Sequence, residues 1–426
     1  MDDLKLSLFY KKRDSFLLIV FLLFILLLNL FLKYQNYRDF TSQKYRQTEA
    51  TVINQFKKST KTSKTYYILK LKDKNGVLFY GISWKKGLKD LKNCRISFKV
   101  KSDKIDFKSY LKGFFAPIYG VKTISCGDTL RAKLFAYISK QHKEKFLKEL
   151  FCALFLGGSI DKDARAKIQN IGVSHLVAIS GFHLGVLSAI LFLMLTPFYR
   201  FFQDRYFPYR NLKFDLMVVV WVALFCYLYM VGFLPSLLRA FVMLSIGYLF
   251  YIRHIKILSF QTILLTVLIV LCFYPELIFS ISFWFSISGV FYIFLFLHYF
   301  KDLKPWHIFI FVGLWVYFMM MPIVHYIFGS FGPYQLLSPF ISIAFIIFYP
   351  LELFLHIFGY GGLLDKAVVK LFSFDISSIE IKTPLWFLML FISTSLLAIY
   401  KKIFLYILIF LDALFFAYLF YRYTFG

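Results

Sequence analysis

The sequence predicts an α-helical polytopic membrane protein with about ten transmembrane helices and a small extracytoplasmic OB-like β-barrel domain. Of the 426 residues, 59% are hydrophobic and 22% are aromatic. Most of the apolar residues gather in long runs, whereas one segment near the N-terminus alternates apolar with polar residues. A soluble protein of this length could not bury so much apolar surface, so the excess must face lipid.

Ten apolar runs approach the length that a membrane crossing needs, which is about 17 to 25 helical residues for a hydrocarbon core of roughly 30 Å. They lie near residues 15–32, 173–198, 214–233, 235–252, 257–274, 277–298, 306–328, 336–358, 385–400 and 403–421. The first run follows basic residues 11–13 and lacks a small-residue cleavage pattern behind it. We therefore expect an uncleaved anchor whose N-terminus lies in the cytoplasm.

Positive charges in the short loops predict the orientation of the remaining crossings. With ten crossings, five groups of Lys and Arg fall on the cytoplasmic side, namely those within residues 200–213, 253–256, 301–304 and 366–370 and at Arg422. Lys401 and Lys402 fall on the other side, which is the one conflict. We expect a multi-pass protein of the cytoplasmic (inner) membrane with both termini in the cytoplasm.

The segment from 34 to 125 has the pattern of β-strands. Apolar and polar residues alternate between Lys64 and Trp84 around an Asn75-Gly76 pair, which is typical of a tight hairpin turn. Flanking strands are expected near 46–56 and 94–101. Together they predict a small antiparallel barrel.

This segment is strongly basic. Residues 33–110 contain 20 Lys and Arg but only 6 Asp and Glu. A basic surface attracts polyanions by releasing counterions, and a small barrel with basic and aromatic residues on one face is typical of single-strand nucleic-acid binders. The alternative is an ordinary solvated basic face on a barrel that is structural or binds protein.

The five cysteines form no C-x-x-C pair and have no metal-site spacing, and no cofactor motif is present. Cys94 and Cys126 both fall in the region that we expect outside the cytoplasm. Since that compartment is oxidising, they are candidates for a disulfide.

Residues 131–155 have a helical pattern, with apolar side chains on one side and lysines elsewhere. Such a helix is expected to lie in the headgroup plane. The expected organisation is therefore a membrane anchor at 1–33, the extracytoplasmic β domain at 34–125, an interfacial amphipathic helix at 126–155 and a transmembrane domain at 156–426.

Polar side chains inside a membrane span are costly and usually functional. The densest group is His175, Ser180, Gly181 and His183 at the start of the second run. Gly181 would allow the helix to break, so that freed N–H groups point into a water-filled passage and suit a phosphate. The alternative is a tightly packed helix crossing with internally bonded histidines.

A second polar group follows the turn at 232–234. Pro235 is expected to open a helix that carries Ser236 and, within its first turns, Arg239. This arginine either extends outward to water or awaits an anion. Glu352 and Asp412 are the acidic side chains in spans that could pair with it.

Enzyme signatures such as H-E-x-x-H, G-x-S-x-G and Walker A are absent from the sequence, which predicts a protein that is not an enzyme and needs no metal. A membrane hydrolase with His175 as base and Ser180 as nucleophile remains an alternative. It would need an acid to orient the base, and none lies nearby in the sequence.

The stretch ALFLGGSIDKDARAKIQNIGVSHLVAISGFHLGVL, residues 153–187, closely resembles the signature of the ComEC competence family of DNA-uptake channels. GFLPSLLRA and YPELIFSISFWFSISGVFYIF resemble the next two blocks of that family in order and spacing. Residues 106–115 resemble its junction between barrel and channel. The likeness covers about residues 34 to 360, and makes the domain at 156–426 a competence-type channel domain.

The resemblance implies transport of single-stranded DNA across the cytoplasmic membrane during natural transformation. It assigns the DNA path to His175, Ser180, Gly181, His183, Pro235, Ser236 and Arg239. Many members have an acidic residue after the first glycine of the block, where this chain has Gly157-Gly158. Many also carry a C-terminal metallo-β-lactamase-like domain, and this sequence stops before it, so a separate nuclease is expected to degrade DNA.

The expected partners are single-stranded DNA, the lipid bilayer, an extracytoplasmic DNA-receptor protein, and a cytoplasmic motor or single-strand-binding protein. A motor or trap is needed because each phosphate moving against a potential of 100 mV costs about 2.3 kcal/mol, and the chain has no nucleotide-binding loop. The runner-up function is transport of a smaller anionic solute or lipid.

Overall fold

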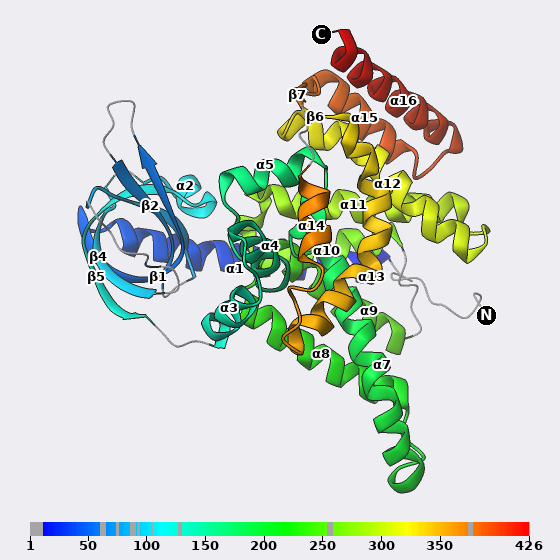
Figure 1. Cartoon of the computed structure of the whole chain (residues 1–426), viewed down its shortest axis with the longest axis horizontal. Coiled ribbons are helices and arrows are strands. Elements are labelled where there is room, and N and C mark those ends of the chain that lie inside the picture. The colour runs from blue at the N-terminus through cyan, green and yellow to red at the C-terminus, as the bar shows by residue number, and fades with distance from the viewer. Residues whose placement is uncertain are drawn as a thin grey trace. The chain divides into compact units, whose positions relative to one another are not determined.

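The computed structural model describes residues 12–59, 65–73, 76–85, 91, 94–103, 105–126, 130–253, 259–373 and 378–425 (Figure 1). Lys11, Lys64, Asn75 and Lys256, used above, lie outside these residues. The chain forms two compact units, and each is described by itself. Among the described residues, one comprises 12–136 with 268–280, and the other comprises 137–267 with 281–425.

The first unit begins with the helix α1 (Lys12–Thr41), which is longer than the expected anchor. No glycine or proline interrupts it after residue 33, so the helix continues and its last turns join the barrel. Phe40 is buried in the barrel core, and the Tyr37 hydroxyl donates to the Ile105 carbonyl at 2.9 Å. The expected boundary at residue 33 therefore falls inside a helix.

Five strands follow and close into a barrel with the order β1-β2-β3-β5-β4, in which β4 pairs back to β1. The pairs are antiparallel except for β3 with β5. This is the OB-like barrel that the sequence predicts. Its elements are β1 (Tyr45–Ser59), β2 (Thr65–Asp73), β3 (Leu78–Ser83), β4 (Cys94–Lys101), the short helix α2 (Phe107–Lys112) and β5 (Phe115–Cys126).

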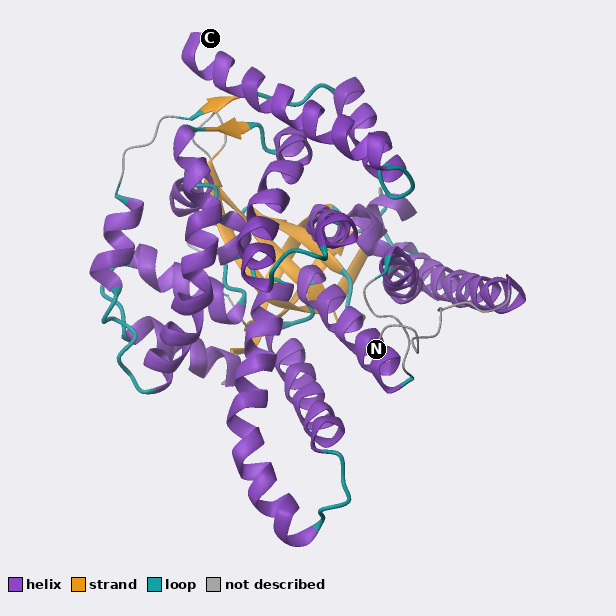
Figure 2. Ribbon diagram, turned by 90° about the vertical axis from the view of Figure 1, so that its right-hand side faces the viewer, coloured by secondary structure: helices purple, strands orange, loops and turns teal. Residues whose placement is uncertain are grey.

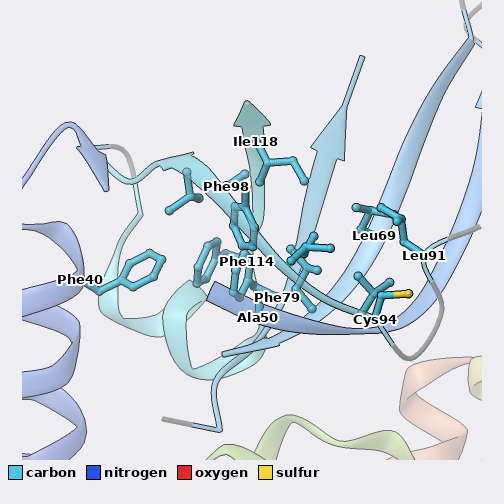
Figure 3. Close-up of a cluster of buried hydrophobic side chains, with 14 of the residues drawn as sticks. Phe40, Ala50, Leu69, Phe79, Leu91, Cys94, Phe98, Phe114 and Ile118 are labelled. Atoms are coloured by element: carbon cyan, nitrogen blue, oxygen red, sulfur yellow. The ribbon is translucent and has the colours of Figure 1, made fainter. Parts of the chain in front are cut away.

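Alternating side chains fill the barrel. Phe79 and Phe98 are almost fully buried, and the ring of Phe79 stacks on that of Phe114 with centroids 5.0 Å apart (Figure 3). A Cβ at Gly81 would lie 2.8 Å from side-chain carbons of both Leu71 and Ile118. Glycine therefore lets these side chains pack against the backbone of β3.

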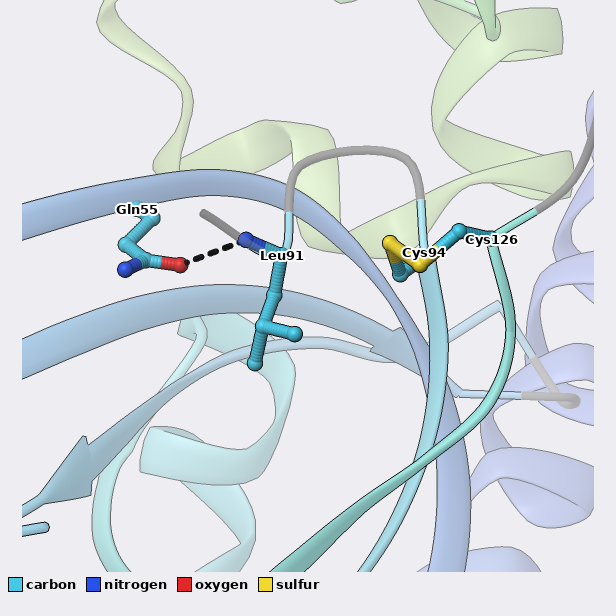
Figure 4. Close-up of a disulfide and its surroundings, with 4 residues drawn as sticks. All are labelled: Gln55, Leu91, Cys94 and Cys126. Atoms are coloured by element: carbon cyan, nitrogen blue, oxygen red, sulfur yellow. Dashed lines mark hydrogen bonds between the residues drawn. A yellow bond between two sulfur atoms is a disulfide. The ribbon is translucent and has the colours of Figure 1, made fainter. Parts of the chain in front are cut away.

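A disulfide joins Cys94 and Cys126, which are direct partners in the β4–β5 ladder (Figure 4). It ties the start of β4 to the end of β5, 32 residues later in the chain. Close by, the Leu91 N–H donates to Gln55 Oε1 at 3.0 Å. The pair singled out from the sequence is thus joined in the structure.

Maleimide labelling tests this disulfide. In the chain denatured without a reductant, we expect three cysteines to react, namely the free thiols of Cys152, Cys226 and Cys272. After reduction all five should react. A Cys94→Ser and Cys126→Ser double variant is the control, and it should give three in both conditions. Five reactive thiols before reduction would contradict the bridge.

The second unit is mostly helical, and helices predominate over the whole chain (Figure 2). Eight helices in the described residues are long and apolar enough to cross a membrane, α1 among them. The seven others are α7 (Gly181–Tyr206), α8 (Leu212–Val231), α9 (Pro235–Ile252), α11 (Ile281–Phe300), α12 (Pro305–Ile327), α13 (Ser338–Ile357, preceded by η2, Pro333–Leu337) and α16 (Lys402–Phe425).

Each of the ten predicted runs corresponds to a helix, and this is a multi-pass membrane protein. The fifth and ninth runs form only α10 (Phe260–Phe273) and α15 (Leu385–Leu397), with 14 and 13 residues. A perpendicular crossing takes about 17 residues, so these two helices are shorter than the sequence predicts.

Short elements join these helices. They are α5 (Lys162–Asn170), α6 (Ser174–Val177), α14 (Asp365–Phe372), η1 (Pro275–Phe279), β6 (Ser330–Phe331) and β7 (Ile379–Glu380).

The expected single interfacial helix at 126–155 is instead two helices, α3 (Leu130–Lys140) and α4 (Lys145–Leu156). Every residue from Leu150 to Leu156 is buried. The run of apolar residues in α4 is too continuous for a one-sided surface helix, so it packs in the helical unit on all sides.

Candidate functional site

The second apolar run is broken where its polar residues cluster. α6 ends at Val177, the backbone is extended through Ser180, and α7 begins at Gly181. Ser180 caps α7: its N–H donates to His183 Nδ1 at 3.2 Å, and its Oγ lies 3.1 Å from the same nitrogen. The break that Gly181 suggested in the sequence is therefore present, and a reciprocal cap holds it.

The start of α9 packs against this break. Pro235 is the first residue of α9, and the next residue, Ser236, donates its hydroxyl to the Ile179 carbonyl at 2.6 Å. A Cβ on Gly181 would lie 3.2 Å from Ala240 Cβ and 3.3 Å from Arg239 Nη2. Glycine thus allows the arginine side chain to pass over the backbone of α7. We call Ser180, Gly181, His183, Ser236 and Arg239 the helix-break site.

Arg239 is buried, with 5% of its surface exposed, and forms no ion pair within the part of the chain that the structure describes. Its Nη1 contacts Met243 Sδ at 3.8 Å, and its Nε has no hydrogen-bond partner. The expectation that Glu352 or Asp412 pairs with it is wrong. Glu352 lies beside His356, and Asp412 Oδ1 has no hydrogen-bond partner among the residues that the structure describes. An unpaired buried guanidinium carries a desolvation penalty of several kcal/mol, on the order of that for other buried ions.

His183 is fully buried. Because Nδ1 accepts from Ser180, the neutral ring carries its proton on Nε2. That nitrogen is buried and has no hydrogen-bond partner within the described part of the chain. The ring of Tyr349 in α13 packs edge-on against His183, with centroids 4.7 Å apart.

The sequence led us to expect that these side chains line an open, water-filled passage. In this structure they do not, because neighbouring helices cover His183 and Arg239. The aromatic residues Phe182, Phe345 and Tyr349 surround the imidazole. The histidine and arginine of the helix-break site are therefore covered here, whereas Ser180, Gly181 and Ser236 are partly exposed.

His175 lies apart from this cluster. Its Nδ1 is 3.2 Å from the Gly172 carbonyl and its Nε2 is 3.1 Å from Ser342 Oγ in α13. Ser180 contacts His183 instead of His175, so the structure does not assemble the base and nucleophile that the hydrolase alternative requires.

Gly157 is the first glycine of the Gly157-Gly158 pair, at which this chain departs from the family pattern. It ends α4 in the left-handed region, with φ +64°. A Cβ there would also lie 2.8 Å from Leu234 Cδ1 in the turn before α9. Gly157→Ala is expected to destabilise the protein by about 1 to 3 kcal/mol, because a side chain in this conformation is strained. A lower melting temperature of the purified protein in detergent would show it. Gly185→Ala is the control, since nothing lies within 4 Å of a Cβ there; equal melting temperatures would contradict the prediction.

The barrel carries a second candidate site on its outer surface. Lys99 and Lys101 point outward from β4, opposite Tyr119 of β5 and Tyr45 of β1. The two tyrosine rings are exposed and lie 6.2 Å apart. Lys122 shares a hollow with Tyr119, and Trp84 and Lys85 line its other side. We call Tyr45, Lys99, Lys101, Tyr119 and Lys122 the lysine–tyrosine strip.

Sequence reasoning missed one polar group altogether. His142, His356 and Asp365 meet in the helical unit although more than 200 residues separate the first from the others. The only signal in the sequence is that a histidine stands within the apolar run 336–358.

A family model described as Competence protein matches residues 154–424, more than half of the chain. This chain belongs to the competence protein family. The resemblance to the ComEC family is thereby confirmed.

Two curated relatives are similar over part of this competence protein. Recombination protein 2 of Haemophilus influenzae is 30% identical over 168 residues, which cover 38% of this chain and 20% of that protein. An uncharacterized protein of Aquifex aeolicus is 24% identical over 201 residues, 46% of this chain and 43% of that protein. The aligned part thus spans less than half the length of either relative. No solved structure matches.

Proposed function

We propose that this chain transports single-stranded DNA across the cytoplasmic membrane during natural transformation, and that the strand passes the helix-break site. The observation that carries the proposal is Arg239, a buried guanidinium in a spanning helix with no ion pair among the described residues. A phosphate placed beside it would accept charge-assisted hydrogen bonds and remove the penalty of an isolated charge.

The conducting state must differ from the closed arrangement described above. The contacts that would have to part are the Ser236–Ile179 hydrogen bond and the approach of Gly181 to Ala240. A strand that binds only the open state would shift the equilibrium toward it. His175, exposed next to the break, would then border the same path as Pro235 and His183.

The barrel would capture the strand outside the cytoplasm. In the lysine–tyrosine strip, bases could stack on Tyr45 and Tyr119 while the lysines neutralise phosphates. The disulfide supports an extracytoplasmic position, because such bonds persist in oxidising compartments. Both termini would then lie in the cytoplasm, as the loop charges predict.

Other proteins would complete the process. An extracytoplasmic receptor would deliver DNA, a separate nuclease would degrade one strand, and a cytoplasmic motor or single-strand-binding protein would retain the incoming strand. These partners follow from the family resemblance and from the work needed against the membrane potential.

Reconstituted vesicles test the proposal. With single-strand-binding protein trapped inside, labelled single-stranded DNA added outside should become resistant to external nuclease, whereas duplex DNA should stay sensitive. Vesicles without the protein are the control. Uptake of inorganic phosphate or movement of anionic lipid, with no protected DNA, would instead favour the smaller-anion transporter.

A further inference from the structure

The barrel has an opening where β3 ends and β5 continues. The two strands are joined by a short parallel ladder, and its last residue pair is Ile82 with Pro117. Beyond Pro117, β5 runs on to Cys126 and pairs along its other edge with β4. Within the described part of the chain, the edge of β5 that faces β3 is therefore free from there on, and its backbone N–H and C=O groups remain available.

A hollow of about 460 Å³ lies at this opening. Ser83, Trp84 and Lys85 at the end of β3 form one side of it, and Ile118 to Lys122 of β5 form the other. We call it the Trp84 hollow. Its volume falls within the roughly 300 to 1,000 Å³ of small-molecule sites. The described residues that line it include two lysines and no acidic residue, so the hollow favours an anionic ligand.

A bulge in β5 brings a ring and a positive charge to the same face. In a regular strand, side chains three residues apart point to opposite faces. Tyr119 pairs with Lys99 of β4. Lys122 pairs with Ser97, which is two residues from Lys99 and so lies on the same face of β4. Gly120 permits this shift of register because it adopts φ +64°. The bulge therefore places Tyr119 and Lys122 side by side in the hollow.

The indole of Trp84 is held in place from β2. The ring of Tyr66 packs against it, with centroids 5.0 Å apart and ring planes inclined at 33°. Trp84 nevertheless keeps 52% of its surface exposed. Single exposed tryptophans are common on protein surfaces. This one borders a hollow that also holds a second ring and two lysines, so it offers a prepared stacking surface beside positive charge.

These groups fit a nucleotide whose base is turned out of the stack. Every base has a flat face, and stacking it on an aromatic ring is worth about 1 to 3 kcal/mol. The phosphates next to that base would find Lys85 on one side of the hollow and Lys122 on the other. An acidic peptide would pair with the lysines, but its carboxylates have no flat face to stack on the indole.

Tyr119 connects the Trp84 hollow to the lysine–tyrosine strip. Its ring lines the hollow and lies 6.2 Å from the ring of Tyr45 in the strip. A strand that passes from Tyr45 over Tyr119 to Trp84 would meet a ring from each of three segments of the barrel. This continuity favours a DNA strand over a free mononucleotide, which would occupy the hollow alone.

We propose that the Trp84 hollow receives one unpaired base of the DNA and thereby makes the barrel select single strands over duplex. The inference rests on the proposed function and names the feature by which the strand is recognised. Paired bases lie inside the duplex, and turning one out costs a few kcal/mol. A single strand offers its bases without that cost. The lysines contact phosphates, which both forms display, so the distinction falls to Trp84.

The affinities of the full chain in detergent for single-stranded and duplex DNA of one sequence test the proposal. Trp84→Ala should weaken single-strand binding about 5-fold to 150-fold. Its duplex binding should stay unchanged, which also reports that the barrel is intact. Trp84→Phe keeps a ring and should keep most of the preference. Trp306→Ala is the matched control, since Trp306 is 68% exposed but lies in α12, and both affinities should match those of the wild type.

Photo-cross-linking locates the base. Single-stranded DNA that carries iodouracil should cross-link to Trp84 in the wild type, and this product should be missing from Trp84→Ala. Iodouridine monophosphate at the same concentration should cross-link far less, because it makes no contact with the strip. Cross-links confined to the strip, or an equal loss of single-strand and duplex affinity in Trp84→Ala, would overturn the base site. Equal cross-linking by the monophosphate would show a mononucleotide site and overturn the proposed selection of strands.

Vesicle uptake separates this inference from the proposed function. If single-stranded DNA enters vesicles while Trp84→Ala keeps the wild-type preference for single strands, the base site is overturned and the proposed function stands. If the preference depends on Trp84 but no DNA enters vesicles, the proposed transport is overturned and the base site stands.

Discussion

Arg239→Met is expected to slow the passage of single-stranded DNA into vesicles strongly and, at the same time, to leave the protein as stable as the wild type or more so. The loss of transport follows because the side chain would no longer offer a charge to the phosphates in the open state. Truncating one partner of a buried charge pair costs about 2 to 5 kcal/mol, which is roughly a 30-fold to 5,000-fold change in rate.

The gain in stability has a separate cause. In the closed structure the guanidinium is buried with its Nε unsatisfied. Replacing it with an apolar side chain of similar length removes that penalty, as replacing buried ion pairs often does. A purely structural arginine would behave in the opposite way, since its removal would lower the melting temperature.

Uptake and melting temperature should therefore be measured on the same preparations. Arg253→Ala is the control, because Arg253 is exposed at the other end of the same helix, and it should leave both quantities unchanged. His183→Ala should reduce uptake in the same direction. Normal uptake by Arg239→Met would exclude the helix-break site from the path.

The features that sequence predicts well are those written in local patterns. Alternation around Gly76 predicts the β2–β3 hairpin, and apolar runs predict the spans, because side-chain periodicity and hydropathy act within one element. The disulfide between Cys94 and Cys126 could be proposed from the oxidising compartment in which both residues were expected. Even the break before Gly181 is a local effect, since a glycine within a polar cluster weakens a helix.

What sequence could not predict depends on packing between distant segments. Whether Arg239 faces water or apolar side chains is decided by α7 and by the closure of the bundle, and no property of residues 232–240 reveals it. The contact of His142 with Asp365 joins residues that lie far apart in the sequence, and neither has a distinctive neighbour in the chain. Likewise, the length of α1 depends on the barrel core that receives Phe40.

The second large effect is expected at the barrel, and it should fall on DNA capture rather than on transport. Stacking of one base on an aromatic ring is worth about 1 to 3 kcal/mol, so Tyr119→Ala should weaken binding of single-stranded DNA about 5-fold to 150-fold. Tyr209→Ala is the control, since that ring is 86% exposed but belongs to the loop after α7.

The lysines of the strip should act through salt dependence. For single-stranded DNA the logarithm of affinity falls with the logarithm of salt by about 0.7 per phosphate neutralised, so Lys99→Gln with Lys122→Gln should reduce that slope by about 1.4. Arg95→Gln should change this slope little, because Glu49 already pairs with Arg95 at 2.8 Å.

Binding of labelled DNA to the full chain in detergent, titrated with salt, measures both the loss of affinity in Tyr119→Ala and the change of slope in the lysine variant. Since Arg239→Met should leave this slope intact and the strip variants should lower uptake only at limiting DNA, the two sets of variants separate capture from passage. Equal slopes for the double variant and the wild type would remove the barrel from the pathway.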